Sequence, residues 1–205
     1  MATVMVHAVV SVDGFIADES DDVGPLFDWY FNGNHALGGG NGMKVSAVSS
    51  QYVHPMWDSI GCTIMGRHLF DLTNGWEGRP PAGEHVVVVT HRGRPDGWHP
   101  EASYRFVDDV AEAVGTATTL AGDGVVAVTA GDVGGQALAL GLVDVVAMDV
   151  VPVVFGRGKR YFGSVDSQHL LDDPDVVIRG DRVLHLRYPV RQAPGSPGAR
   201  RGLTR

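Results

Sequence analysis

The chain has 205 residues with a formal net charge of −8, and 44% of its residues are hydrophobic. A chain of this length fits one domain with a sizeable core. No apolar run approaches the roughly 20 residues that a membrane span requires, and the single cysteine, Cys62, excludes an intrachain disulfide. We therefore expect a globular, cytoplasmic protein without membrane attachment.

The charge is spread unevenly along the chain. Four of the 16 Lys and Arg residues lie in the Pro/Gly-rich segment 191–205, which contains no acid, so residues 1–190 carry 12 basic against 24 acidic residues. An acidic body repels a phosphate backbone, so we expect no nucleic-acid partner. We predict one domain over residues 1–190. The segment 191–205 is predicted to be a solvated tail, with binding to an anionic partner as the alternative.

The first half of the chain begins with a predicted strand at Val4–Val10. Pro25–Phe31 predicts a short helix whose aromatic side chains face inward or line a pocket. The Gly/Asn-rich segment 32–44 predicts a flexible loop that is either functional or simply disordered. Ser46–Asp58 predicts a helix, and Cys62–Met65 predicts a short buried strand that runs into a Gly-Arg step.

The second half continues the alternation of strands and helices. The apolar run His85–Thr90 is typical of a strand that is buried on both faces. Asp109, with Glu112 three residues later, indicates the N-terminus of a helix. Further predicted strands are Tyr104–Val107, Val125–Thr129 and Val145–Val151, a helix is predicted at Val133–Leu140, and Val176–Arg179 and Val183–Tyr188 predict a closing hairpin. This order predicts an α/β fold with a central, mostly parallel sheet, helices on both faces and a C-terminal antiparallel hairpin.

Three predicted strands end in steps that are suited to phosphate binding. These steps are Gly66-Arg67, Thr90-His91-Arg92 and Gly131–Gly135. Ligands of open α/β sheets bind at the carboxyl ends of the strands, where helix N-termini present unpaired N–H groups. The glycines of the third step would let a pyrophosphate approach the backbone. Each step alone is explained by a turn or a solvated arginine, but the three together favour a dinucleotide site.

Five segments in this order resemble the dihydrofolate reductase-like superfamily, and specifically the family of the RibD C-terminal domain, the riboflavin-biosynthesis reductase. The similarity extends from about Val4 to Tyr188. The segments are SVDGFIAD (11–18), TIMGRHLFD (63–71), VVVVTHR (86–92), AGDVGGQALALGLVD (130–144) and VPVVFGRGKRYFG (151–163).

The resemblance implies an NADPH-dependent reductase, often a homodimer, that acts on a small molecule. The Gly-Arg step would bind the 2′-phosphate side of NADPH, the Thr-His-Arg step the adenosine ribose phosphate, and the Gly-rich helix start the pyrophosphate, while the backbone around Ile16-Ala17 would lie beside the nicotinamide carboxamide. The cofactor-binding residues implied in this way are Ile16, Ala17, Gly66, Arg67, His68, Thr90, His91, Arg92, Gly131, Asp132, Val133, Gly134 and Gly135. Leu69, Ala130 and Val145 depart from the family pattern.

The catalytic residue is less clearly marked than the cofactor site. Asp28, in the predicted short helix, is the nearest candidate for the acid that protonates the substrate, and water is the alternative. Asp13 is interpreted as a turn-stabilising residue. The nine His residues form no metal-ligand spacing, so we expect no metal. A dimeric nucleotide-binding protein without turnover is the alternative to a reductase.

Overall fold

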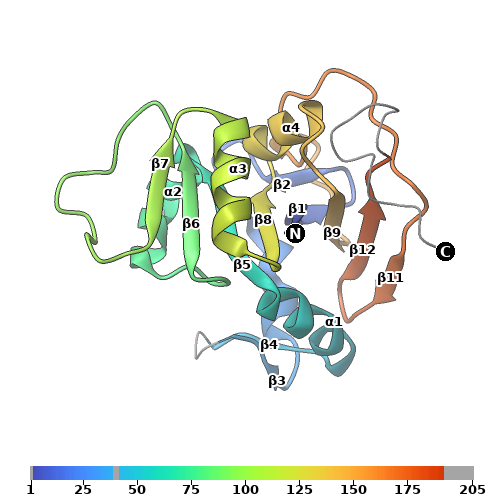
Figure 1. The fold of residues 1–205 in the computed structure, drawn as a ribbon. Helices are drawn as coiled ribbons and strands as arrows, with labels where there is room; N and C mark the ends of the chain where they lie inside the picture. Colours follow the sequence, from blue (N-terminus) through green and yellow to red (C-terminus); the bar gives the residue numbers. More distant parts are fainter. Residues whose placement is uncertain (1, 39–41, 192–205) are drawn as a thin grey trace.

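The computed structural model describes residues 2–38 and 42–191 (Figure 1). The predicted tail, apart from Arg191, lies outside the described residues, as do three positions of the Gly-rich segment 32–44. Among the described helices, none combines the length and apolar character that a membrane crossing needs.

Eight strands form one sheet in the order β11-β12-β9-β1-β8-β5-β6-β7. The neighbouring strands from β9 to β7 are parallel, and β12 runs antiparallel to both of its neighbours. This arrangement confirms the predicted mostly parallel sheet with a C-terminal antiparallel hairpin. The strands are β1 (Thr3–Ser11), β5 (Ile60–Gly66), β6 (His85–Val89), β7 (Tyr104–Val107), β8 (Val125–Thr129), β9 (Val145–Val151), β11 (Val176–Arg179) and β12 (Leu184–Pro189).

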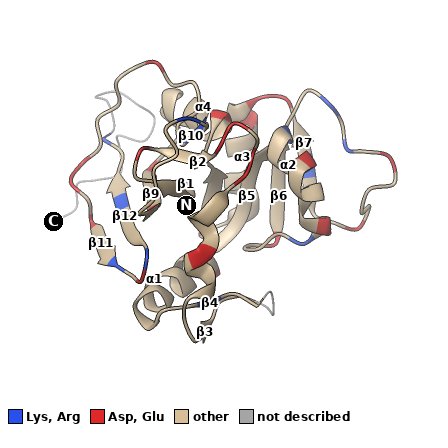
Figure 2. Ribbon diagram, turned by 180° about the vertical axis from the view of Figure 1, so that it is seen from behind, with Lys and Arg blue, Asp and Glu red and all other residues tan. Residues whose placement is uncertain are grey.

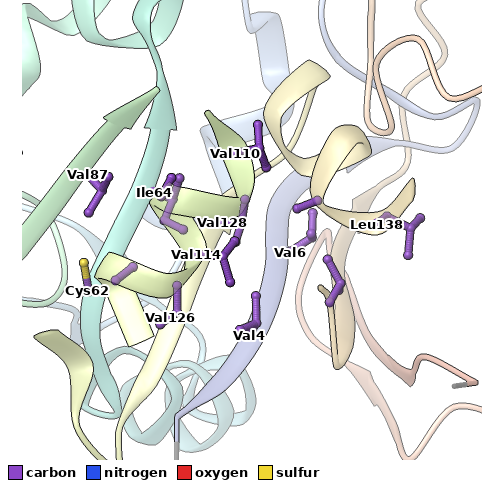
Figure 3. Packing of buried hydrophobic residues seen from close by; sticks show 14 of the residues in the cluster. Val4, Val6, Cys62, Ile64, Val87, Val110, Val114, Val126, Val128 and Leu138 are labelled. Carbon is purple, nitrogen blue, oxygen red and sulfur yellow. The ribbon is translucent and has the colours of Figure 1, made fainter. Parts of the chain in front are cut away.

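One face of the sheet is covered by α3 (Val110–Ala121) and α4 (Asp132–Ala139). The apolar side chains of both helices pack with alternate residues of the central strands in one continuous cluster, part of which is drawn in Figure 3. The helix α3 begins as predicted, because the Asp109 carboxylate accepts a hydrogen bond from the backbone N–H of Glu112 at 2.8 Å.

The opposite face carries two separate apolar clusters. The first, the α1 cluster, lies over β1 and β9 and is formed with α1 (Ala47–Asp58) and the 3-10 helix η1 (Gly24–Phe31). The second, the α2 cluster, lies over β5, β6 and β7 and includes side chains of α2 (Arg67–Thr73). The 3-10 helix η2 (Asn74–Gly78) follows α2. Because strand residues alternate between faces, His7 of β1 and Thr129 of β8 point toward this face, between the two clusters. Neither side chain belongs to either cluster.

Several short elements were not predicted. The strand β2 (Phe15–Ala17) pairs antiparallel with β10 (Lys159–Arg160), and α2 directly follows the Gly-Arg step. The prediction of an irregular loop over 32–44 is wrong in part, because β3 (His35–Ala36) and β4 (Lys44–Val45) form an antiparallel pair there. Of the aromatic residues of η1, which were predicted to face inward or line a pocket, Trp29 and Tyr30 are buried, whereas Phe27 and Phe31 are exposed.

Candidate dinucleotide-binding site

Two arginines from neighbouring strand ends are held together by one carboxylate. Arg67, at the start of α2, donates from Nε to Asp71 Oδ1 at 2.7 Å, and Arg92, after β6, donates from Nη2 to Asp71 Oδ2 at 2.9 Å. Arg67 also donates to the carbonyl of Gly93 at 3.2 Å. The hydrogen bond from Arg67 and the positive charges of both arginines lower the pKa of Asp71. The group carries a net positive charge, and Figure 2 shows basic and acidic positions side by side around α2.

The turn after β6 orients Arg92. The backbone N–H of Arg92 donates to the hydroxyl of Thr90 at 3.0 Å, and the backbone N–H of Thr90 donates to the carbonyl of Val107 at 2.7 Å. Thr90 is therefore buried in the turn, whereas His91 and Arg92 are exposed. Of these three predicted cofactor residues, Arg92 is exposed and paired with Asp71, and Thr90 fixes its backbone.

The N-terminus of α4 offers unpaired donors beside these arginines. No side chain caps this helix. The N–H of Gly131 donates to the carbonyl of Tyr161 at 2.7 Å, and the first intrahelical bond is made by Gly135. The backbone N–H groups of Asp132, Val133 and Gly134 therefore lack an intrahelical acceptor, which is the arrangement that binds phosphate oxygens.

Close approaches bring the three strand ends to one edge of the sheet. A Cβ on Gly66, at the end of β5, would lie 3.1 Å from the Val133 side chain of α4. A Cβ on Gly131 would lie 3.7 Å from the Ile16 side chain of β2. Gly131 has a φ of +93°, which favours glycine. Together with the contact of Arg67 and Arg92 through Asp71, these distances place the three predicted steps around a shared edge of the sheet.

His68 lies at this edge but is engaged by the protein itself. Its Nε2 lies 2.9 Å from Oδ1 of Asp21, in the loop after β2. The hydrogen bond from His68 lowers the pKa of Asp21, and Lys159 lies 3.6 Å from the same oxygen. The pair connects α2 with the loop that follows Ile16-Ala17.

Gly134 and Gly135 are packed tightly by the protein itself. We predicted that their small size lets a pyrophosphate approach, but the space of a Cβ is already occupied by the protein at both positions. A Cβ on Gly134 would lie 2.8 Å from the carbonyl oxygen of Thr129, and one on Gly135 would lie 2.2 Å from that of Phe162. These glycines allow α4 to pack against β8 and the chain around Phe162.

This packing predicts that two glycine-to-alanine substitutions in helices change the free energy of unfolding in opposite directions. Gly135→Ala should lower the free energy of unfolding by about 1–3 kcal/mol, because the new methyl group collides with backbone atoms. Gly115→Ala, inside α3 with nothing within 4 Å of the added Cβ, should instead raise it by about 0.5–1 kcal/mol. Urea unfolding of both variants measures the difference. Equal stabilities would contradict the packing described for α4.

The two acidic residues singled out near the N-terminus have different surroundings. Asp13 accepts hydrogen bonds from the Ser11 hydroxyl at 2.6 Å and from the N–H of Gly156 at 2.7 Å, so it is a turn-stabilising residue as predicted. The Ser11 hydrogen bond also lowers its pKa. Asp28 is exposed on η1, whose buried residues Leu26, Trp29 and Tyr30 point into the α1 cluster. No hydrogen bond or ion pair among the described residues joins Asp28 to the three strand ends described above.

A buried polar network, absent from the sequence-based predictions, lies on the α1 face of the sheet. Asp149 of β9 is 1% exposed and lies 2.6 Å from Nδ1 of His185 in β12 and 3.0 Å from Nε2 of His7 in β1. The Nε2 atom of His185 lies 2.9 Å from the hydroxyl of Ser49 in α1. A buried charge requires such partners.

The network holds Asp149 in its ionised form. Burial alone would raise the pKa of Asp149, but the charge of His7 and the hydrogen bonds from both histidines lower it to about 2. Burial together with the negative charge of Asp149 raises the pKa of Tyr30, and raises that of Tyr52 to about 12. Asp149 is therefore a negative charge among neutral hydroxyl groups.

Two cavities lie elsewhere on the molecule. One of about 520 Å³ lies between the end of α1 and the segment Pro80–Glu84, and one of about 480 Å³ is lined by Phe15, Leu138 and Phe162 among others. Neither is lined by Arg67 or Arg92. Within residues 2–38 and 42–191, no group of three or more His, Cys, Asp or Glu side chains is placed to hold a metal ion.

No family model matches the sequence, and no curated protein matches it. Solved structures do match, at low sequence identity. A protein from Shewanella sp. PV-4 that is named for riboflavin biosynthesis is 20% identical with a TM-score of 0.67, and the match covers 94% of this chain and 100% of that one.

Two further structures match over most of this chain. The diaminohydroxyphosphoribosylaminopyrimidine deaminase/5-amino-6-(5-phosphoribosylamino)uracil reductase of Thermotoga maritima is 15% identical with a TM-score of 0.61, and the match covers 93% of this chain but 57% of that one. Dihydrofolate reductase from Enterococcus faecalis, in complex with NADP(H), is 16% identical with a TM-score of 0.53 and coverages of 93% and 97%. The chain therefore has the dihydrofolate reductase-like fold and is structurally similar to RibD proteins.

Proposed function

We propose that this protein is an NADPH-dependent reductase of a small heterocyclic, imine or carbonyl substrate. The observation that carries the proposal is the shared edge at which Arg67 and Arg92, bridged by Asp71, lie beside the uncapped N-terminus of α4. An arginine pair and an uncapped helix N-terminus, side by side, suit a ligand with two separate phosphate groups.

Separate groups of the described residues suit the separate parts of NADPH. Arg67 and Arg92 keep N–H groups that Asp71 does not use, and these would bind the 2′-phosphate. The N–H groups of residues 132–134 would hold the pyrophosphate. The Ile16 side chain lies against Gly131, so β2 would lie near the nicotinamide end. Asp71 is acidic, and its role is to fix both guanidinium groups in one orientation before the phosphate arrives.

In this proposal, bound NADPH would supply a hydride to an electrophilic carbon. The chain contributes position and electrostatics, which dominate catalysis of this type. The sequence-based proton sources are Asp28 and water, and Asp28 is the proposed catalytic residue on that reasoning. The kcat of Asp28→Asn separates these sources, because it falls if Asp28 gives the proton and is unchanged if water does.

The substrate class is proposed from the fold matches. One matching protein is named as a reductase of 5-amino-6-(5-phosphoribosylamino)uracil and another is a dihydrofolate reductase, so reduction of a nitrogen heterocycle is the activity to test first. A ribosylaminopyrimidine and a heterocycle of secondary metabolism are both compatible with the groove. We further propose that the protein is cytoplasmic and a homodimer.

The alternative is a nucleotide-binding protein without turnover, and the exposed position of Asp28 is the observation that favours it. NADPH titration followed by intrinsic tryptophan fluorescence tests the binding step shared by both functions. NADPH oxidation with a panel of pyrimidine, pterin and imine substrates, monitored at 340 nm, then tests turnover. Binding with turnover supports the reductase, binding with no turnover across the panel supports the alternative, and no binding contradicts both.

A further inference from the structure

The buried network around Asp149 has one end that is not fully buried. The side chains of His185 and Asp149 are 0% and 2% exposed, whereas that of His7 is 15% exposed. At the other end, the Ser49 hydroxyl is buried and accepts a hydrogen bond from the Ser46 hydroxyl at 3.2 Å. His7 is therefore the point at which the network reaches the surface.

The direction of the hydrogen bonds follows from the chemistry of the groups. An ionised carboxylate only accepts, so Asp149 accepts from Nδ1–H of His185 and from Nε2–H of His7. Ser49 then donates its hydroxyl proton to Nε2 of His185. Both nitrogens of His185 are thus occupied. His7 is fixed as the Nε2–H tautomer, and its Nδ1 has no partner among the described residues.

His7 also lies close to the proposed cofactor groove. It is paired in register with Thr129, the last residue of β8, and Gly131 follows two residues later. Its side chain points to the sheet face between the α1 cluster and the α2 cluster and is 15% exposed. A substrate that receives hydride from a cofactor at the end of β8 would lie over this part of the sheet.

We propose that His7 is the catalytic residue that gives the substrate its proton, and that Asp149 is the positioning residue that holds the His7 ring. The proposal rests on the proposed function. For a C=N substrate, NADPH would supply the hydride of the new C–H bond at carbon. His7 would act as the imidazolium, with Nε2–H on Asp149 and a second proton on Nδ1, and that second proton would form the new N–H bond at nitrogen, leaving His7 as the neutral Nε2–H tautomer. The cofactor leaves as NADP⁺, and His7 regains its proton from water. His7 replaces Asp28 in this role.

The first test is an NMR experiment that needs no substrate. The imidazole signals of His7 are assigned with His7→Gln, and long-range ¹H–¹⁵N spectra report the tautomers. We expect Nε2–H for His7 and Nδ1–H for His185, and we expect Asp149→Asn to abolish the fixed tautomer of His7. NADP⁺ should then shift the His7 ring signals, and 2′-phospho-ADP-ribose, which lacks nicotinamide, should leave them unchanged. The buried His185 serves as the internal control.

The outcomes separate this proposal from the proposed function. If NADP⁺ binds and the His7 signals do not move, the role of His7 is overturned while the cofactor site stands. If NADP⁺ does not bind, both proposals fail.

A second, kinetic test uses any substrate that the panel identifies. His7→Gln should lower kcat about 100- to 10,000-fold, the range for general acid catalysis, with NADPH affinity within about threefold of the wild type. Asp28→Asn is the rival variant, because the two proposals assign the same proton to different residues. A large loss in Asp28→Asn and none in His7→Gln would return the proton-donor role to Asp28.

Discussion

Replacing Arg67 with alanine should weaken NADPH binding by about 1–3 kcal/mol, or about 5- to 150-fold, and should change NADH binding far less. The reason is that the two cofactors differ only in the 2′-phosphate, which the guanidinium groups of Arg67 and Arg92 would bind. In the structure, Asp71 holds both groups in place before any ligand binds. The variant also loses the packing of Arg67 over the Phe70 ring, at 5.3 Å, but that loss affects both cofactors equally.

Titration of each cofactor by fluorescence or calorimetry measures this difference. Arg179→Ala is the matched control, because Arg179 is exposed on β11 at the opposite edge of the sheet. It should leave both affinities unchanged at constant ionic strength. Equal losses of NADPH and NADH affinity in Arg67→Ala would mean that Arg67 is not the 2′-phosphate ligand.

The second large effect concerns stability. Asp149→Ala should lower the free energy of unfolding by about 3–5 kcal/mol, because it leaves His7 and His185 without their shared acceptor inside the protein. Asp175→Ala is the control. It breaks a two-point ion pair with Arg187, but both side chains are about two-fifths exposed, so the loss should stay below about 1 kcal/mol. Urea unfolding at pH 7 gives both values.

The same carboxylate should contribute to acid unfolding. The folded-state pKa of Asp149 is lowered from 3.8 to about 2, so its contribution, about 2 kcal/mol, is complete above pH 4 and is lost as the pH falls toward 2. Asp149→Asn should remove this part of the pH dependence. An unchanged slope of stability against pH between 4 and 2 in this variant would show that Asp149 is not ionised in the folded protein.

The sequence was sufficient to predict the sheet because its strands carry a strong signal. His85–Thr90 and Val125–Thr129 are apolar runs that are typical of a strand buried on both faces. The hairpin at Gly180 closes the sheet as predicted. The helix α2 was missed because it has seven residues and begins without a side-chain cap. Nothing in its sequence marks where it starts.

The sequence predicted the place of the candidate site better than the role of each residue. The glycines at 134 and 135 follow a strand, as in a phosphate-binding turn, but only the structure shows that Thr129 and Phe162 occupy the space beside them. The network around Asp149 depends on strand register, which brings together residues 142 positions apart in the sequence. A single charged residue inside the apolar strand VVAMDVV was the available signal, since such a residue requires a buried partner.

The central claim is that three strand ends form one groove for one phosphorylated dinucleotide, and a ¹H–¹⁵N map of backbone amides during NADP⁺ titration tests it most directly. The account predicts that the amides of Arg67, Arg92 and residues 131–134 shift together, with one dissociation constant. Shifts at only one of the three strand ends, or different dissociation constants for the three, would contradict it.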